Sequence, residues 1–100
     1  MPSKKQPIFP SEKKLLADFG ERLRLARLRR NISAETLAER SSISRMTLHR
    51  AEKGSAAVSM GTYLRILAAL HLQDDINLLA MDDQLGRKLQ DLELKWPRKK

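Results

Sequence analysis

Apolar residues recur along most of this chain at steps of three and four, the spacing that places side chains on one face of an α-helix. The first such series extends from residue 11 to about residue 30 and contains Leu16, Phe19, Leu23 and Ala26. Ser11 is the expected N-cap, because a serine hydroxyl can accept a hydrogen bond from the first helical turn. Gly20 lies inside the series and weakens the helix prediction, since glycine is a poor helix former.

Three shorter helices are expected next, and each apolar series begins after a serine. The expected N-caps are Ser33, Ser44 and Ser59. Gly54 is expected to end the helix that Ser44 begins, because glycine readily adopts the left-handed conformation after a helix. A short fifth helix is predicted with Asp74 or Asp75 as its cap, and its apolar residues are Leu78, Leu79 and Met81. No segment alternates at period two for long enough to predict a sheet, so the pattern predicts an all-α fold.

The segment after residue 83 contains two different patterns. Leu85, Leu89 and Leu92 have helical spacing, whereas residues 92–96 alternate between apolar and polar, which predicts an extended strand. Five large apolar residues therefore lie outside the expected five-helix core: Leu85, Leu89, Leu92, Leu94 and Trp96. We expect them to contact a homodimer partner or a second protein. Trp96 either packs on its own domain or anchors a partner, because tryptophan is enriched at interface hot spots.

The segment Ser33–Gly54 has the spacing of two short helices joined by a turn of three or four residues. Its inward-facing residues would be Leu37, Ala38, Ile43, Leu48 and Ala51. This spacing is typical of a helix-turn-helix motif, whose second helix enters the major groove of DNA. The outward face of that helix would carry Arg45, Met46, His49 and Arg50, flanked by Thr47 and Lys53. A basic helix face rich in hydrogen-bond donors suits duplex DNA.

The net charge of +8 is unevenly distributed and agrees with a polyanionic partner. Residues 1–54 carry thirteen basic and six acidic side chains, whereas residues 55–94 carry three basic and six acidic ones. The basic part would bind nucleic acid, and the acidic part indicates a second partner.

These residues resemble the Xre-type, or lambda-repressor-like, helix-turn-helix family from Leu23 to about Leu72. The matching segments are Gly20–Leu23, Ala26–Arg27, Ile32–Arg40, Ile43–Gly54 and Leu64–Leu70. The resemblance implies a five-helix DNA-binding domain that acts as a dimer on a palindromic operator. It also implies that Arg45, Met46 and Arg50 face bases, and that Thr47, His49 and Lys53 face bases or phosphates.

The same resemblance assigns further residues. Ser33 and Ser44, at the starts of the two helices, complete the expected DNA-binding set. Arg27 and Glu52 match the buried ion pair of the family. Ser42 stands where the family usually has a glycine, at a turn position that often needs a positive φ.

The segment Gln84–Trp96 resembles the tail of HipB-like antitoxins, which pair with HipA-like serine/threonine kinase toxins. This second resemblance implies an antitoxin that represses the promoter of its own toxin–antitoxin operon. The alternative is a phage-type or restriction-controller regulator without a toxin partner.

Other function classes are not expected. With no cysteine and two histidines the chain is not expected to bind a metal or cofactor. No phosphate-binding loop or catalytic triad pattern is present, so no enzymatic activity is expected. No apolar run reaches the ~18–20 residues of a membrane span, and a cytoplasmic, nucleoid-associated protein is expected. The expected divisions are a flexible arm (1–10), a helix-turn-helix domain (11–82) and a C-terminal extension (83–100) for dimer or partner contact.

Overall fold

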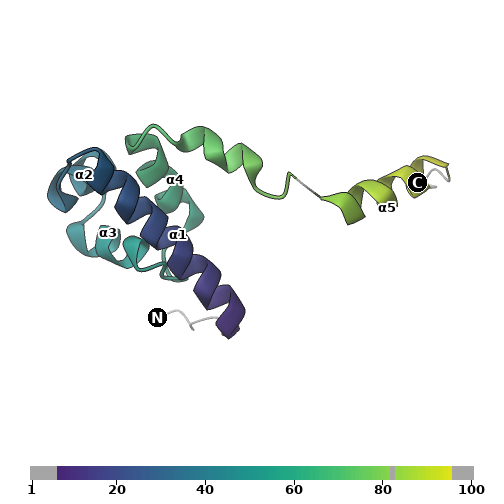
Figure 1. The fold of residues 1–100 in the computed structure, drawn as a ribbon, viewed down its shortest axis with the longest axis horizontal. Coiled ribbons are helices and arrows are strands. Elements are labelled where there is room, and N and C mark those ends of the chain that lie inside the picture. The colour runs from purple at the N-terminus through teal and green to yellow at the C-terminus, as the bar shows by residue number, and fades with distance from the viewer. Residues whose placement is uncertain (1–6, 82, 96–100) are drawn as a thin grey trace.

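The chain folds into helices joined by short turns. A computed structural model describes residues 7–81 and 83–95. The helices are α1 (Pro10–Arg29), α2 (Ala34–Arg40), α3 (Arg45–Glu52), α4 (Met60–Ala69), the 3-10 helix η1 (Gln73–Leu78) and α5 (Gln84–Lys95). Every regular element in these described ranges is a helix, which confirms the all-α prediction. Figure 1 shows α1 to α4 gathered into one body, with α5 lying well apart from it.

The three central helices start with the same four-residue pattern, Ser-x-x-Thr. In each, the serine hydroxyl accepts the threonine backbone N–H and donates to the threonine hydroxyl: Ser33 with Thr36, Ser44 with Thr47, and Ser59 with Thr62. Such caps satisfy backbone donors that a helix N-terminus otherwise leaves without partners. The three expected serine caps are therefore confirmed.

The start of α1 differs from the prediction. Phe9 is the N-cap, Pro10 is the first helical residue, and Ser11 lies inside the helix. Proline suits this first position because its missing N–H would have no partner there. The Glu12 carboxylate accepts the backbone N–H of Phe9 at 3.0 Å, so this helix start is held by Glu12 and not by a cap at Ser11. Residue 10 thus belongs to the helix, and residues 1–6 of the expected arm lie outside the described residues.

The core lies between α1, α2, α3 and α4. Its buried apolar members are Leu23, Ala26, Leu37, Ala38, Leu48, Ala51, Tyr63, Ile66, Leu67 and Leu70. Four of the five residues expected to face inward in the helix-turn-helix segment are among them, and Ile43 packs against the core from a half-buried position. The sequence pattern therefore predicts correctly which face of α3 is exposed.

The expected fifth helix forms as η1, with two differences. Asp74 and Asp75 lie in its first turn, and its N-cap is Leu72 without a side-chain hydrogen bond. The helix ends at Leu78, so Leu79 and Met81 lie beyond it. Among all the described residues, 7–81 and 83–95, no helix is long and apolar enough to cross a membrane.

The expected strand over residues 92–96 is wrong for residues 92–95, which continue α5. The Asp83 carboxylate accepts the backbone N–H of Gly86 at 2.8 Å and so caps this helix. The period-two alternation covers only five residues, whereas Leu85, Leu89 and Leu92 sustain the helical spacing over two turns. Trp96 lies outside the described residues.

Candidate nucleic-acid interface

The exposed face of α3 collects most of the residues expected to contact DNA. Arg45, Met46, His49 and Arg50 are exposed, as is Lys53 directly after the helix, whereas Thr47 is half-buried. Leu48 and Ala51 on the opposite face are fully buried. Because both packed residues point into the core, the rotation of α3 about its axis is fixed and its donors face outward.

This face borders a hollow between α1 and α3, called the α1–α3 hollow below. Its volume is about 680 Å³, and its lining residues are Glu21, Arg24, Arg27, Ala34, Arg45, Met46, His49, Arg50, Glu52 and Lys53. Arg24 enters the site from α1, with its guanidinium 2.7 Å from the Glu21 carboxylate. Cations from two helices therefore surround one concave surface, an arrangement that attracts a phosphate backbone.

Ser33 and Ser44 lie at the starts of α2 and α3, where their hydroxyls form the helix caps. Both residues are exposed, but each hydroxyl already holds the first turn of its own helix. The Ser44 cap places Arg45 as the first residue of α3. At the other end of the exposed face, Arg50 Nη2 lies 3.4 Å from Met46 Sδ, one helical turn away.

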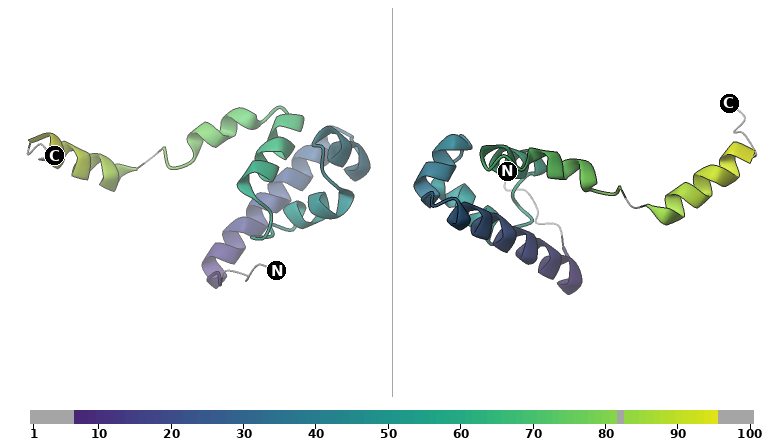
Figure 2. Two further views of the ribbon diagram at one scale, coloured as in Figure 1. Left: turned by 180° about the vertical axis from the view of Figure 1, so that it is seen from behind. Right: turned by 45° about the horizontal axis from the view of Figure 1, so that its top comes forward.

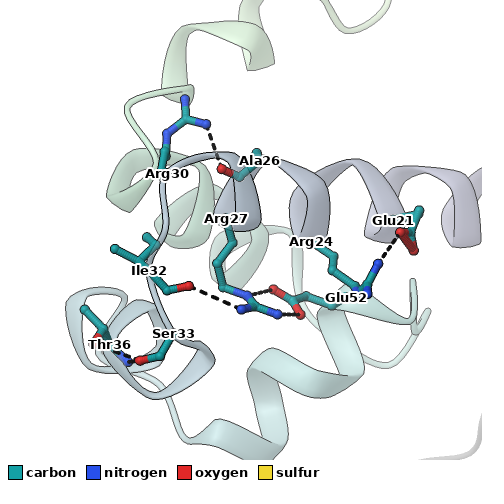
Figure 3. Close-up of polar contacts among 9 residues, drawn as sticks. All are labelled: Glu21, Arg24, Ala26, Arg27, Arg30, Ile32, Ser33, Thr36 and Glu52. Carbon is teal, nitrogen blue, oxygen red and sulfur yellow. Dashed lines mark hydrogen bonds and ion pairs between the residues drawn. The ribbon is translucent and has the colours of Figure 1, made fainter.

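Arg27 and Glu52 join the end of α1 to the end of α3 (Figure 3). Arg27 Nε donates to Glu52 Oε2 at 2.8 Å, and Nη2 donates to Oε1 at 3.1 Å. Arg27 Nη1 also donates to the backbone carbonyl of Ile32 at 3.3 Å, which reaches the segment before α2. The hydrogen bonds that Arg27 donates to the Glu52 carboxylate raise the pKa of Arg27, so the guanidinium stays charged.

The two side chains of this pair are only 12% and 9% exposed. Two parallel hydrogen bonds fix the relative orientation of guanidinium and carboxylate more strictly than one contact does. Glu52 is the last residue of α3. The pair therefore holds the helix that carries the exposed donors against α1.

Gly20 forms a second link between α1 and α3, and its helical context in the sequence gives no sign of this. A Cβ at residue 20 would lie 2.5 Å from the backbone N of Gly54 and 2.7 Å from the carbonyl oxygens of Ala51 and Glu52. Gly54 has a φ of 73°, and a Cβ there would overlap the backbone of Leu16. Glycines at both positions let the backbone of α1 touch the end of α3 directly.

The turn before α3 has the expected backbone. Ser42 has a φ of 57°, the left-handed conformation for which the resemblance predicts a glycine. A non-glycine residue pays about 1 kcal/mol for this conformation. Asn31 and His71, which directly follow the C-caps of α1 and α4, also have positive φ values, 56° and 62°.

The residues expected to contact a partner lie elsewhere. Leu85, Leu89 and Leu92 are exposed on α5, which Figure 2 shows far from α3 in both of its views. Leu94 belongs to α5, but its side chain and all of Trp96 lie outside the described residues.

Comparison with protein families places this fold. The helix-turn-helix domain family matches residues 18–79, which is more than half of the chain. The chain therefore belongs to the helix-turn-helix domain family, a class of DNA-binding domains. A comparison with curated proteins finds no match.

Proposed function

We propose that the chain is a sequence-specific transcriptional repressor that binds a palindromic DNA operator as a homodimer. The observation that carries this proposal is the orientation of α3. Its apolar face is fully buried at Leu48 and Ala51, and its opposite face presents exposed arginines. In helix-turn-helix domains this second helix lies in the major groove, and the two helices of a dimer contact half-sites about 34 Å apart.

Each residue has a role that follows from its chemistry. Arg45 and Arg50 donate paired hydrogen bonds to guanine O6 and N7, the commonest specific contact in the major groove. Met46 lies between them on the exposed face and contacts a thymine methyl group. Lys53 and Arg24 border the α1–α3 hollow and contact phosphates, which add affinity without sequence preference.

Alanine variants test this division of roles. Arg45→Ala or Arg50→Ala should reduce discrimination between the operator and single-base variants, by about 1–3 kcal/mol at the contacted base pair. Lys53→Ala should weaken all sequences alike and lower the slope of log K against log salt by about 1 for each phosphate that the lysine no longer neutralises. Competition titrations at several salt concentrations measure both quantities. A uniform loss across sequences for both arginine variants would contradict base contact.

We further propose that the repressor is the antitoxin of a HipA-like serine/threonine kinase and represses the promoter of its own operon. The support is the resemblance of Gln84–Trp96 to HipB-like tails, together with the acidic balance of residues 55–94. The described part of this tail lies away from α3, so contacts that the tail makes leave α3 free to occupy DNA.

The adjacent reading frame and co-expression with its product test the antitoxin role. We expect the neighbouring gene to encode a HipA-like kinase that co-purifies with this chain and loses its toxicity in the complex. A restriction enzyme or a phage gene at that position would instead support a regulator without a toxin.

A further inference from the structure

An apolar groove lies on the side of the domain formed by α1, α4 and η1. Its volume is about 560 Å³. The principal apolar side chains that line it are Leu15, Phe19, Met60, Leu64, Leu78 and Leu79. Four of these six (Leu15, Met60, Leu78 and Leu79) are 60–68% exposed. An exposed apolar surface of this kind marks an interaction site.

Three contacts between side chains and backbone hold the floor of this groove. The rings of Phe19 and Tyr63 are 5.2 Å apart between centroids, and the Tyr63 hydroxyl donates to the carbonyl of Ser55 at 2.7 Å. Arg22 covers the Phe19 ring, with its guanidinium carbon 5.8 Å from the ring centroid. A partner therefore meets a formed surface and need not first order it.

The same chain carries a second apolar surface, on α5. Leu85, Leu89 and Leu92 are 68%, 54% and 49% exposed. Their steps of four and three residues place them in one stripe along the helix. A stripe with this spacing is the pattern by which an amphipathic helix binds an apolar groove.

We propose that α5 of one copy binds the groove of a second copy, and that the second copy returns the contact. The proposal rests on the homodimer of the proposed function and assigns its interface. A two-fold symmetric exchange of this kind uses the groove and the stripe of both copies, so no apolar surface of either type is left open. The two contacts add to one interface, and a stable interface buries roughly 1,200–2,000 Å² in total.

The position of α5 favours a second copy over the groove of its own chain. Leu78 and Leu79 lie at the edge of the groove, and α5 begins at Gln84. All views show α5 beyond the body of the domain (Figures 1 and 2). The stripe is thus presented outward, where another molecule can meet it.

A coiled coil between two α5 helices accounts for less of the structure. The helix has 12 residues, and isolated helices shorter than about 12–15 residues are marginal in water. A stable coiled coil needs about three to four heptads. Such a pair would also leave the groove, with Met60 and Leu78, exposed to water.

Charges beside the two surfaces agree with this pairing. Lys88 lies next to the stripe, three residues after Leu85 and one before Leu89. Asp75 lines the groove from η1. Each of the two surfaces that the proposal joins is therefore bordered by a charge opposite to one beside the other.

The exchange leaves the DNA-binding surface free. α1 contributes Leu15 and Phe19 to the groove but Glu21 and Arg24 to the α1–α3 hollow, and the two sites share no lining residue. One dimer can therefore present two α3 helices while both grooves are filled.

Two single variants of the full-length chain disrupt one side of the contact each. Leu89→Asp places a charge in the stripe, and Met60→Asp places one in the groove at the first residue of α4, where an acidic residue favours the helix. In sedimentation experiments without DNA, each should raise the dimer dissociation constant about a hundredfold or more, because a hot-spot residue is removed twice per dimer. The matched controls are Gln90→Asp on α5 and Gly61→Asp on α4, which add the same charge outside the contact. Each should change the dimer dissociation constant less than threefold.

Mixing the two variants is the decisive step. The groove of the Leu89→Asp chain and the stripe of the Met60→Asp chain are intact, so a mixed pair regains one of the two contacts. The mixture should therefore form a heterodimer that is weaker than the wild-type dimer but tighter than the dimer of either variant alone. A coiled coil predicts no rescue, and docking of α5 into its own groove predicts that neither variant changes the dimer; either result overturns the proposal. Loss of kinase binding in the Leu89→Asp variant, with an unchanged dimer, would also overturn it.

The test separates this inference from the proposed function. If the wild-type chain is dimeric and binds DNA, and both variants are dimeric as well, the exchange is contradicted but the proposed function is not. A wild-type chain that is monomeric at all concentrations contradicts the homodimer itself, and operator binding measured in parallel shows whether DNA recognition stands without it.

Discussion

Replacing Gly20 with alanine should lower the free energy of unfolding by about 2–3 kcal/mol, the cost of inserting a group into a well-packed contact. Alanine normally stabilises a helix interior relative to glycine, by roughly 0.5–1 kcal/mol. The sign reverses here because the added methyl group meets three backbone atoms, at 2.5, 2.7 and 2.7 Å. Backbone atoms cannot rotate away, so α1 and the end of α3 must separate.

Gly61 provides the matched control for this substitution. It lies in α4, and the nearest atom to an added Cβ is Ser59 Oγ at 3.9 Å. Gly61→Ala should therefore follow the ordinary rule and stabilise the protein slightly. Thermal unfolding of both variants measures the difference, with a fall of roughly 10–20 °C for Gly20→Ala. Equal or higher stability of Gly20→Ala would show that α1 and α3 do not touch as the structure has them.

The helix-turn-helix segment is well predicted from the sequence, because its local signals agree. Ser33 and Ser44 cap their helices, Gly54 adopts the left-handed conformation after α3, and Leu37 and Leu48 are fully buried. Each signal needs only neighbours within one turn of helix or a short apolar series. The exposed face of α3 follows directly from the buried one.

Features that depend on distant residues are not predictable in this way. Considered alone, Gly20 only weakens a helix. Its role in the contact between α1 and α3 depends on Gly54, more than thirty residues later in the chain, which lies against it. The groove likewise combines side chains of α1, α4 and η1, which are far apart in the sequence. Three predictions about helix ends are wrong: the cap at Ser11, the cap at Asp74 or Asp75, and the strand in residues 92–95. At Ser11 and in residues 92–95, two local signals compete.

The close contact at Gly20 and the ion pair of Arg27 with Glu52 both join α1 to α3, but they act differently on DNA binding. The first sets the distance between the two backbones, while the second fixes the end of α3 in one orientation. Of the two contacts, only the ion pair has charged members that line the α1–α3 hollow, so only its substitution changes the charge there. This difference allows the positioning role of Glu52 to be separated from its electrostatic one.

Glu52→Ala should lower the free energy of unfolding by about 3 kcal/mol, because it leaves the Arg27 guanidinium nearly buried without its carboxylate. Replacing both residues, as Arg27→Met with Glu52→Leu, should restore much of this loss, since no unpaired buried charge remains. Urea unfolding of the single and double variants measures the coupling between the two side chains. Additive losses would contradict a coupled pair.

For Glu52→Ala, the two possible roles of Glu52 predict different changes in DNA binding. Loss of a carboxylate beside DNA should by itself strengthen binding to every sequence, because one repulsive charge is gone. Loss of the orientation of α3 should instead lower the preference for the operator over random DNA, by roughly tenfold, equivalent to about 1.4 kcal/mol. We expect the second result, measured at a temperature where the variant is folded.

Glu21→Ala is the matched control, because Glu21 lines the same hollow and pairs with Arg24 while both side chains are about half exposed. An exposed pair of this kind contributes about 0–1 kcal/mol, so the control should stay stable and bind all DNA slightly more tightly. If Glu52→Ala behaves in the same way, the ion pair does not position α3. A fall in operator preference for Glu52→Ala alone would establish that α3 needs this carboxylate to meet the bases in register.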